Sequence, residues 1–143
     1  MGAQPMTART KNLDVRCVVD SRDDLGEGAM WCPAEQAVYW LNIPMPSRLH
    51  RYHPVSGRHQ SWDMPEMISA LAMRRDGTLL VASHHGLNSF DPADGRLIRL
   101  AAPEADRPQN RSNDGAPDAR GRFWFGTMMN NLGPSGEDLP IGD

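Results

Sequence analysis

A chain of 143 residues is the usual length of one domain, and 39% hydrophobic residues suffice for a packed core. The formal net charge is −3 and the fifteen Lys and Arg form no basic run, so we expect no nucleic-acid partner. No apolar run reaches membrane-spanning length, and the first residues lack the apolar core of a signal peptide, so we expect a cytoplasmic protein without a membrane partner.

The N-terminal residues 1–12 are polar and are predicted to be disordered, which leaves residues 13–143 for the folded part. The first predicted strand covers residues 13–20, LDVRCVVD. It contains Cys17, and Cys32 follows 15 residues later. In a cytosolic protein we expect two buried, reduced thiols, with a disulfide as the alternative.

The rest of the chain shows short strand patterns bounded by turns and no convincing helix. The predicted strands span residues 37–43, 48–53, 70–75, 78–83, 86–91, 96–100 and 122–127. This pattern is typical of an antiparallel all-β protein.

A repeat organises these strands. Tyr52-His-Pro-Val-Ser-Gly57-Arg58 recurs 38 residues later as Phe90-Asp-Pro-Ala-Asp-Gly95-Arg96. Each copy is an aromatic strand end, a turn begun by Pro and closed by Gly, and a second strand. A repeat of roughly 40 residues with four short strands indicates the blade of a β-propeller. The alternative is a β-sandwich whose hairpins resemble each other by chance.

By this count the chain supplies about two and a half blades. Blade one covers about residues 28–62, blade two covers about 67–100, and blade three begins near Arg111. Propellers have about four to eight blades, so we expect the chain to be the incomplete N-terminal part of a propeller. Its open edges give two copies a route to self-association.

Glu27 stands between Gly26 and Gly28, shortly before the apolar run of residues 37–43. Acids are usually kept out of such surroundings unless something pairs with them. From the residues alone, the simplest interpretation is a turn residue facing solvent.

Three segments resemble the senescence-marker-protein/gluconolactonase family, the regucalcin-like lactonases. They are LGEGAMWCPAEQAVYWLNI (25–43), the stretch from residue 48 to residue 87, and NRSNDGAPDARGRFWFGTM (110–128). The resemblance covers the N-terminal half of a family member. It implies a six-bladed β-propeller with one divalent metal ion on its axis that hydrolyses a sugar lactone to its aldonic acid.

The resemblance also implies roles for residues. Glu27 matches a metal ligand, and Arg111 and Asn113 match residues that contact the substrate. The acid/base Asp and the remaining ligands belong to later blades, so no catalytic residue is assigned in this chain. We therefore expect Glu27 to be buried and compensated by calcium, zinc, magnesium or manganese.

Each assignment in the third segment has a structural alternative. Arg111 would also suit a surface arginine paired with Glu104 or Asp106, and residues 113–115, Asn-Asp-Gly, would also suit a simple turn. Ser112 departs from the family pattern beside the expected substrate site, and so does Ala116. These two changes bear on which lactone the site accepts.

Two other functions compete with a sugar lactonase. One is a non-enzymatic calcium-binding or regulatory propeller. The other is an inactive, truncated fragment of a lactonase, since only one metal ligand is assigned in this chain.

Overall fold

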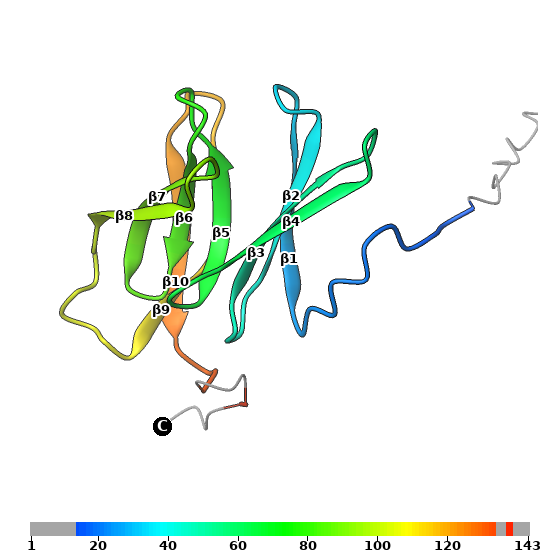
Figure 1. Cartoon of the computed structure of the whole chain (residues 1–143). Helices are drawn as coiled ribbons and strands as arrows, with labels where there is room; N and C mark the ends of the chain where they lie inside the picture. The colour runs from blue at the N-terminus through cyan, green and yellow to red at the C-terminus, as the bar shows by residue number, and fades with distance from the viewer. Residues whose placement is uncertain (1–13, 134–136, 139–143) are drawn as a thin grey trace, which may run out of the picture.

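The computed structural model describes residues 14–133 and 137–138, and its regular structure consists of antiparallel strands (Figure 1). The first sheet contains β1 (Gly26–Cys32), β2 (Ala37–Asn42), β3 (Arg48–His53) and β4 (Arg58–Asp63). The second contains β5 (Ile68–Met73), β6 (Leu79–Ser83), β7 (Gly86–Asp91) and β8 (Arg96–Ala101). A hairpin of β9 (Asn110–Pro117) and β10 (Phe123–Met129) follows. The predicted all-β class is confirmed.

Each four-stranded sheet is a meander in which strand order follows chain order. The first strands of successive units meet, because β5 contacts both β1 and β9 (Figure 1). Sequential meanders joined at their first strands are the arrangement of propeller blades. The described residues therefore form two blades and half of a third.

The predicted repeat appears as two equivalent turns. Gly57 closes the β3–β4 turn with φ 69°, and Gly95 closes the β7–β8 turn with φ 74°. Their amides donate to the carbonyls of His53 at 2.9 Å and Asp91 at 2.8 Å. A positive φ of this size favours glycine, which explains why Gly stands at the same place in both copies.

One apolar core spans the first two blades. Its largest fully buried side chains include Tyr39 and Leu41 from the first blade and Phe90 from the second. Trp62 of β4 packs edge-on against Phe90 of β7, with ring centroids 5.4 Å apart. Ser47 adds a polar tie, because its hydroxyl accepts a hydrogen bond from the amide of Ile68 at 3.1 Å.

The strand predicted at residues 13–20 is wrong for its described part, because residues 14–20 form no strand. Val15 there is 86% exposed, and no neighbouring strand pairs with the segment among the described residues. Strand propensity without a partner does not make a strand. Cys17 is consequently exposed rather than buried, whereas Cys32 is buried, and both thiols are free as expected.

The opposite error concerns β1, β4 and β9, which the strand pattern did not identify, and β4 and β9 show why. β4 reads RHQSWD and has a single large apolar residue, Trp62, so it lacks a clear alternation. β9 contains Asn-Asp-Gly, a sequence typical of turns, yet it pairs with β10 on both sides of an irregularity at this sequence. In both strands, pairing with a neighbour overrides the local preference.

Residues 1–12, predicted to be disordered, lie outside the described residues. Within residues 14–133 and 137–138, no helix is long and apolar enough to cross a membrane.

Candidate functional site

Strand β9 carries two of the three predicted site residues. Arg111 pairs with Met128 of β10, and Ser112 pairs with Thr127. An irregularity in register between Phe125 and Thr127 locally bends this hairpin. The turn interpretation of residues 113–115 is therefore wrong, because these residues lie within a strand.

Arg111 is 5% exposed, so its guanidinium is buried. Its Nη1 donates to the Ser112 carbonyl at 3.0 Å and to Asn113 Oδ1 at 3.4 Å, and its Nη2 donates to Asn131 Oδ1 at 3.0 Å. The surface pairing with Glu104 or Asp106 is not formed. Arg111 and Asn113 are thus brought together, as two residues contacting one substrate would require.

Arg111 is also electrostatically unusual. Its Nε is buried and has no hydrogen-bond partner among the described residues. Burial lowers the pKa of Arg111, because a low-dielectric surrounding disfavours the charged form. The three oxygens that accept its hydrogen bonds are all neutral, so nearby oxygen dipoles rather than a carboxylate stabilise its charge.

Ser112 fixes β9 against the second blade. Its hydroxyl donates to the Ser83 carbonyl at 2.7 Å and lies 2.7 Å from the hydroxyl of Ser69. All three serines are buried. This chain of bonds ties β9 to β5 and β6, so the backbone that carries Arg111 and Asn113 has a defined position.

Glu27 lies in β1 opposite Leu41, next to a β-bulge between Glu27 and Met30. Gly28 within the bulge has φ 65°, and a side chain there would contact Leu41. Glu27 is exposed, so its predicted burial is wrong. The alternative of a turn residue facing solvent is right about the exposure and wrong about the turn, because the residue lies in a strand. Its carboxylate makes no hydrogen bond or ion pair with any residue that the structure describes.

The three predicted residues do not form one site within the described part of the chain. Glu27 lines a shallow hollow together with Trp40, whereas Asn113 lines a separate hollow with Ala116 and Trp124. Both hollows lie along first strands, since β1 and β9 each contact β5. The two hollows therefore lie on the first and third units of the fold, on either side of the second blade.

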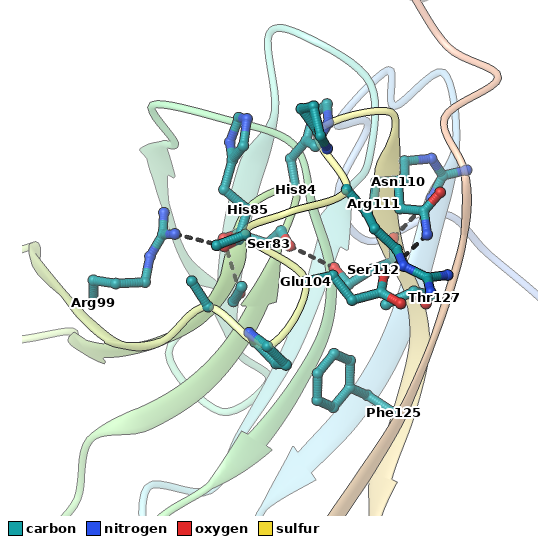
Figure 2. Close-up of a pocket in the computed structure, with 16 residues that line it drawn as sticks. Ser83, His84, His85, Arg99, Glu104, Asn110, Arg111, Ser112, Phe125 and Thr127 are labelled. Carbon is teal, nitrogen blue, oxygen red and sulfur yellow. Dashed lines mark hydrogen bonds between the residues drawn. The ribbon is translucent and has the colours of Figure 1, made fainter.

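Sequence reasoning gave no role to Asn131, which accepts a hydrogen bond from Arg111. The only signal in the sequence is a pair of asparagines directly after β10. The sequence also gave no sign of a cavity of about 240 Å³ beside Arg111 (Figure 2). This cavity is formed by Arg111, the β6–β7 turn and the loop before β9. That cavity is assembled from residues far apart in the sequence.

The described residues do not by themselves form a complete site for a divalent cation. No group of three or more His, Cys, Asp or Glu able to hold a metal ion occurs in the described ranges. Glu27 nevertheless offers a free carboxylate, a hard oxygen donor that suits calcium, magnesium or manganese. Glu27 fits as one ligand, and a bound cation requires further ligands from outside the described residues.

Four-stranded blades joined at their first strands, with polar side chains projecting from those strands, define the class of β-propeller proteins. Within that class, residues 25–142 match the SMP-30/Gluconolactonase/LRE-like region, and the chain belongs to this family.

Similar proteins include the 6-deoxy-6-sulfogluconolactonase of Pseudomonas putida, 36% identical over 90% of this chain and 44% of that protein. The pentonolactonase XacC of Haloferax volcanii is 37% identical over 81% of this chain and 38% of its own length. A solved structure, the calcium-binding protein regucalcin of Agrobacterium tumefaciens, has a TM-score of 0.68 and 44% identity, covering 73% of this chain and 35% of that one. The chain therefore spans less than half the length of these relatives.

Proposed function

We propose that the complete protein hydrolyses a sugar lactone to its aldonic acid with the help of one divalent metal ion. The observation that carries this proposal is the buried Arg111 guanidinium, held beside the amide of Asn113 and lacking a carboxylate partner among the described residues. Two similar proteins named as sugar lactonases support the same chemistry.

A lactone is an internal ester. Its hydrolysis adds the oxygen of water to the carbonyl carbon, breaks the bond to the ring oxygen, and transfers a proton to that oxygen. Negative charge develops on the carbonyl oxygen on the way. A fixed guanidinium in a poorly solvated site stabilises such charge without having to reorganise.

Arg111 and Asn113 supply the groups that bind and orient the substrate. A guanidinium donates in a fixed planar geometry, and a side-chain amide both donates and accepts, so together they suit a polyhydroxylated ring. The hydrogen bond from Arg111 to Asn131 holds the guanidinium in place. Precise placement of the ring accounts for much of the rate in reactions of this kind.

Glu27 is proposed as a ligand of the metal. A bound divalent cation would polarise the lactone carbonyl or lower the pKa of a water molecule. The free carboxylate of Glu27 is available for this role because it has no competing hydrogen bond among the described residues. The identity of the ion and the cytoplasmic location remain predictions.

The proposal is tested on the protein expressed from its complete reading frame. Glucono-, arabino- and other aldonolactones are offered with and without EDTA, and acid release is followed by titration. We expect turnover that EDTA abolishes and that calcium, magnesium, manganese or zinc restores. A folded, metal-loaded protein that hydrolyses none of these lactones would overturn the proposal, and calcium binding without turnover would favour a regulatory propeller instead.

Glu27→Gln tests the metal ligand directly. The change keeps the shape but removes the charge, so we expect calorimetric metal affinity to fall by about tenfold or more, with turnover falling in parallel. Asp63→Asn is the matched control, because Asp63 is an exposed carboxylate at the outer strand of the same sheet. Equal metal affinity in wild type and Glu27→Gln would remove Glu27 from the metal site.

A further inference from the structure

The cavity beside Arg111 lies between the β6–β7 turn and the loop that joins β8 to β9, and we call it the loop pocket (Figure 2). It has a volume of about 240 Å³. His84 and His85 line it from the turn, Glu104 and Arg107 line it from the loop, and Arg111 lines it from β9. Arg111 thus contributes both to this pocket and to the proposed lactone site.

The charged groups of the loop pocket are not balanced. Arg99 is neutralised, because its Nη2 donates to Glu66 at 2.6 Å, and Glu66 also pairs with His85. Glu104 is the acid that lines the pocket, and two further cations, Arg107 and Arg111, line it as well. One positive charge is left over even when both histidines are neutral.

Neither Arg107 nor Arg111 forms an ion pair with Glu104 or with another described acid. The Arg107 guanidinium makes no hydrogen bond or ion pair with any described residue, and the Arg111 guanidinium bonds only to neutral oxygens there. Arg111 is buried, and a buried cation without a counter-ion is costly, so an anion beside it would remove part of that cost. Arg107 is exposed and adds positive charge to the same pocket. The loop pocket is therefore complementary to a negatively charged group.

Unpartnered polar atoms point to the same conclusion. Arg111 Nε, which is always an N–H donor, is buried without a hydrogen-bond partner among the described residues. His84 Nε2 is also buried without a partner there, and because the ring already bonds to the backbone carbonyl of Pro108, Nε2 donates only when the imidazole is protonated. Such atoms are rare in proteins and call for a partner. The ring of His84 stacks on that of His85 with centroids 4.3 Å apart, which holds the imidazole in place. An oxyanion offers several acceptor oxygens to donors of this kind.

We propose that the loop pocket binds an oxyanion group, a sulfonate, phosphate or carboxylate, carried by the substrate at the end remote from its lactone ring. The proposal rests on the proposed lactonase function. Arg111 connects the two ends of such a substrate, since it contacts Asn113 on one side and lines the pocket on the other. The chain then favours an acidic sugar lactone over a neutral one.

The test compares two lactones that differ only in the remote group, 6-phosphoglucono-δ-lactone and glucono-δ-lactone, on the complete protein. The measured quantity is the ratio of kcat/KM for the phosphorylated lactone to that for the neutral one. Arg107→Gln is expected to lower this ratio about tenfold, the usual effect of losing a hydrogen bond to a charged group. Arg107 is exposed, so the variant is expected to fold, and its thermal midpoint checks this.

Arg75→Gln is the matched control, because Arg75 is an exposed arginine in the turn after β5 and does not line the loop pocket. It should leave the ratio unchanged. An unchanged ratio in Arg107→Gln, or equal loss in both variants, overturns the proposal.

Calorimetry with inorganic sulfate separates this proposal from the proposed function. Sulfate that competes with the phosphorylated lactone, and whose binding Arg107→Gln weakens, supports the substrate-tail site. Sulfate binding that depends on Arg107 in a protein without any lactonase activity overturns both the proposed function and the substrate tail, and identifies a site for a free anion. Activity on both lactones without a dependence on Arg107 overturns the loop-pocket proposal alone.

Discussion

At the scale of single residues, Arg111 is the most informative side chain. A buried arginine usually has a carboxylate beside it, whereas Arg111 is surrounded by carbonyl and amide oxygens within the described residues. Such an arrangement keeps the guanidinium available for a negative charge that is present only during a reaction or in a ligand. A structural arginine gains nothing from it.

Arg111→Lys is expected to lower kcat/KM for lactone hydrolysis by about 100-fold, the usual cost of losing one donor to a developing oxyanion. Lysine keeps the charge but lacks the planar fork that reaches Asn113 and Asn131 together. The measurement is steady-state kinetics on the complete protein, with Arg75→Lys as the control. Wild-type kinetics in Arg111→Lys would exclude Arg111 from the mechanism.

The sequence predicted part of this residue-scale picture. Resemblance to a family placed Arg111 and Asn113 in one site, and they do share a hydrogen bond. The burial of Arg111 could not be predicted, because Glu104 and Asp106 are near in sequence and look like surface partners. Glu104 instead accepts a hydrogen bond from Asn110 at 3.1 Å. Burial depends on which elements cover a residue, and local sequence does not carry that information.

At the scale of elements, the β6–β7 turn positions His84 and His85 at the wall of the loop pocket. Gly86 closes this turn with φ 139°, and a Cβ at this position would overlap the carbonyl oxygen of Ala101 in the neighbouring strand β8. The close approach of two backbones thus requires glycine at this position.

Gly86→Ala should lower the free energy of unfolding by about 2 kcal/mol or more, because strained backbone and a clash with a carbonyl add together. Gly126→Ala is the control, since a Cβ there meets no atom within 4 Å, and its effect should stay within about 0.5 kcal/mol. Urea unfolding of both variants provides the comparison. Equal stability would show that β8 shifts away without cost.

Some elements were predictable and others were not. Residues 48–53 and 86–91 were predicted with the bounds that the structure shows, because they combine aromatic or apolar residues with flanking turn signals. β4 was not predicted as a strand because its side chains are mostly exposed and polar. Trp31 of β1 and Trp124 of β10 are apolar residues in strands yet are exposed, and each of these strands pairs with a single neighbour within its sheet.

At the scale of the whole molecule, a chain of hydrogen bonds fastens the N-terminal segment to the first blade. Asp23 accepts from Trp40 Nε1 at 2.9 Å and lies 3.1 Å from His50 Nε2, and His50 Nδ1 lies 3.1 Å from His59 Nε2. Asp23 and His50 have side chains only 6% and 2% exposed, whereas His59 is exposed. The three rings of Trp40, His50 and His59 stack on one another.

The ionisation of this chain makes stability depend on pH. Burial opposes ionisation of Asp23, but hydrogen bonds from Ser21 and Trp40 and the nearby His50 together lower its pKa below 3.8. Burial lowers the pKa of His50 below 6.5, with His59 and Arg48 acting in the same direction and Asp23 opposing. Both folded-state pKa values are depressed, so each contribution is fully present above the unfolded pKa and is lost as the pH falls through the folded pKa.

We therefore expect the free energy of unfolding to decrease as the pH falls below about 6.5 and to decrease further below about 4. Asp23→Asn should be less stable than wild type at pH 7.5 and should show a smaller second decrease, because position 23 no longer titrates whereas Glu66 and Asp118, whose pKa values are also lowered, still do. Urea unfolding at pH 7.5, 5.5 and 3.5 measures this. Asp14→Asn, in the exposed part of the same segment, is the control, and parallel pH profiles for Asp23→Asn and wild type would contradict the prediction.

The repeat predicted the overall architecture well, because a fixed spacing of turns reflects the construction of each blade. The relative positions of Glu27 and Arg111 in the fold could not be predicted from the sequence. The two residues lie on different units that are joined through β5, and sequence spacing does not report the distance across a sheet edge. The exposure of Glu27 could not be predicted for the same reason, because it depends on which elements cover β1.

The contact between Trp62 and Phe90 has a practical consequence. It links β4 of one blade to β7 of the next, and Gly95 of the following turn also lies against the indole. Trp31 and Trp124 emit from exposed positions, whereas Trp40 and Trp62 are half-buried. In a Trp40→Phe variant, Trp62 should therefore contribute the bluer part of the intrinsic fluorescence. A red shift on mild denaturation would then signal that neighbouring blades have come apart before either sheet has melted, giving an optical gauge of blade separation without any added dye.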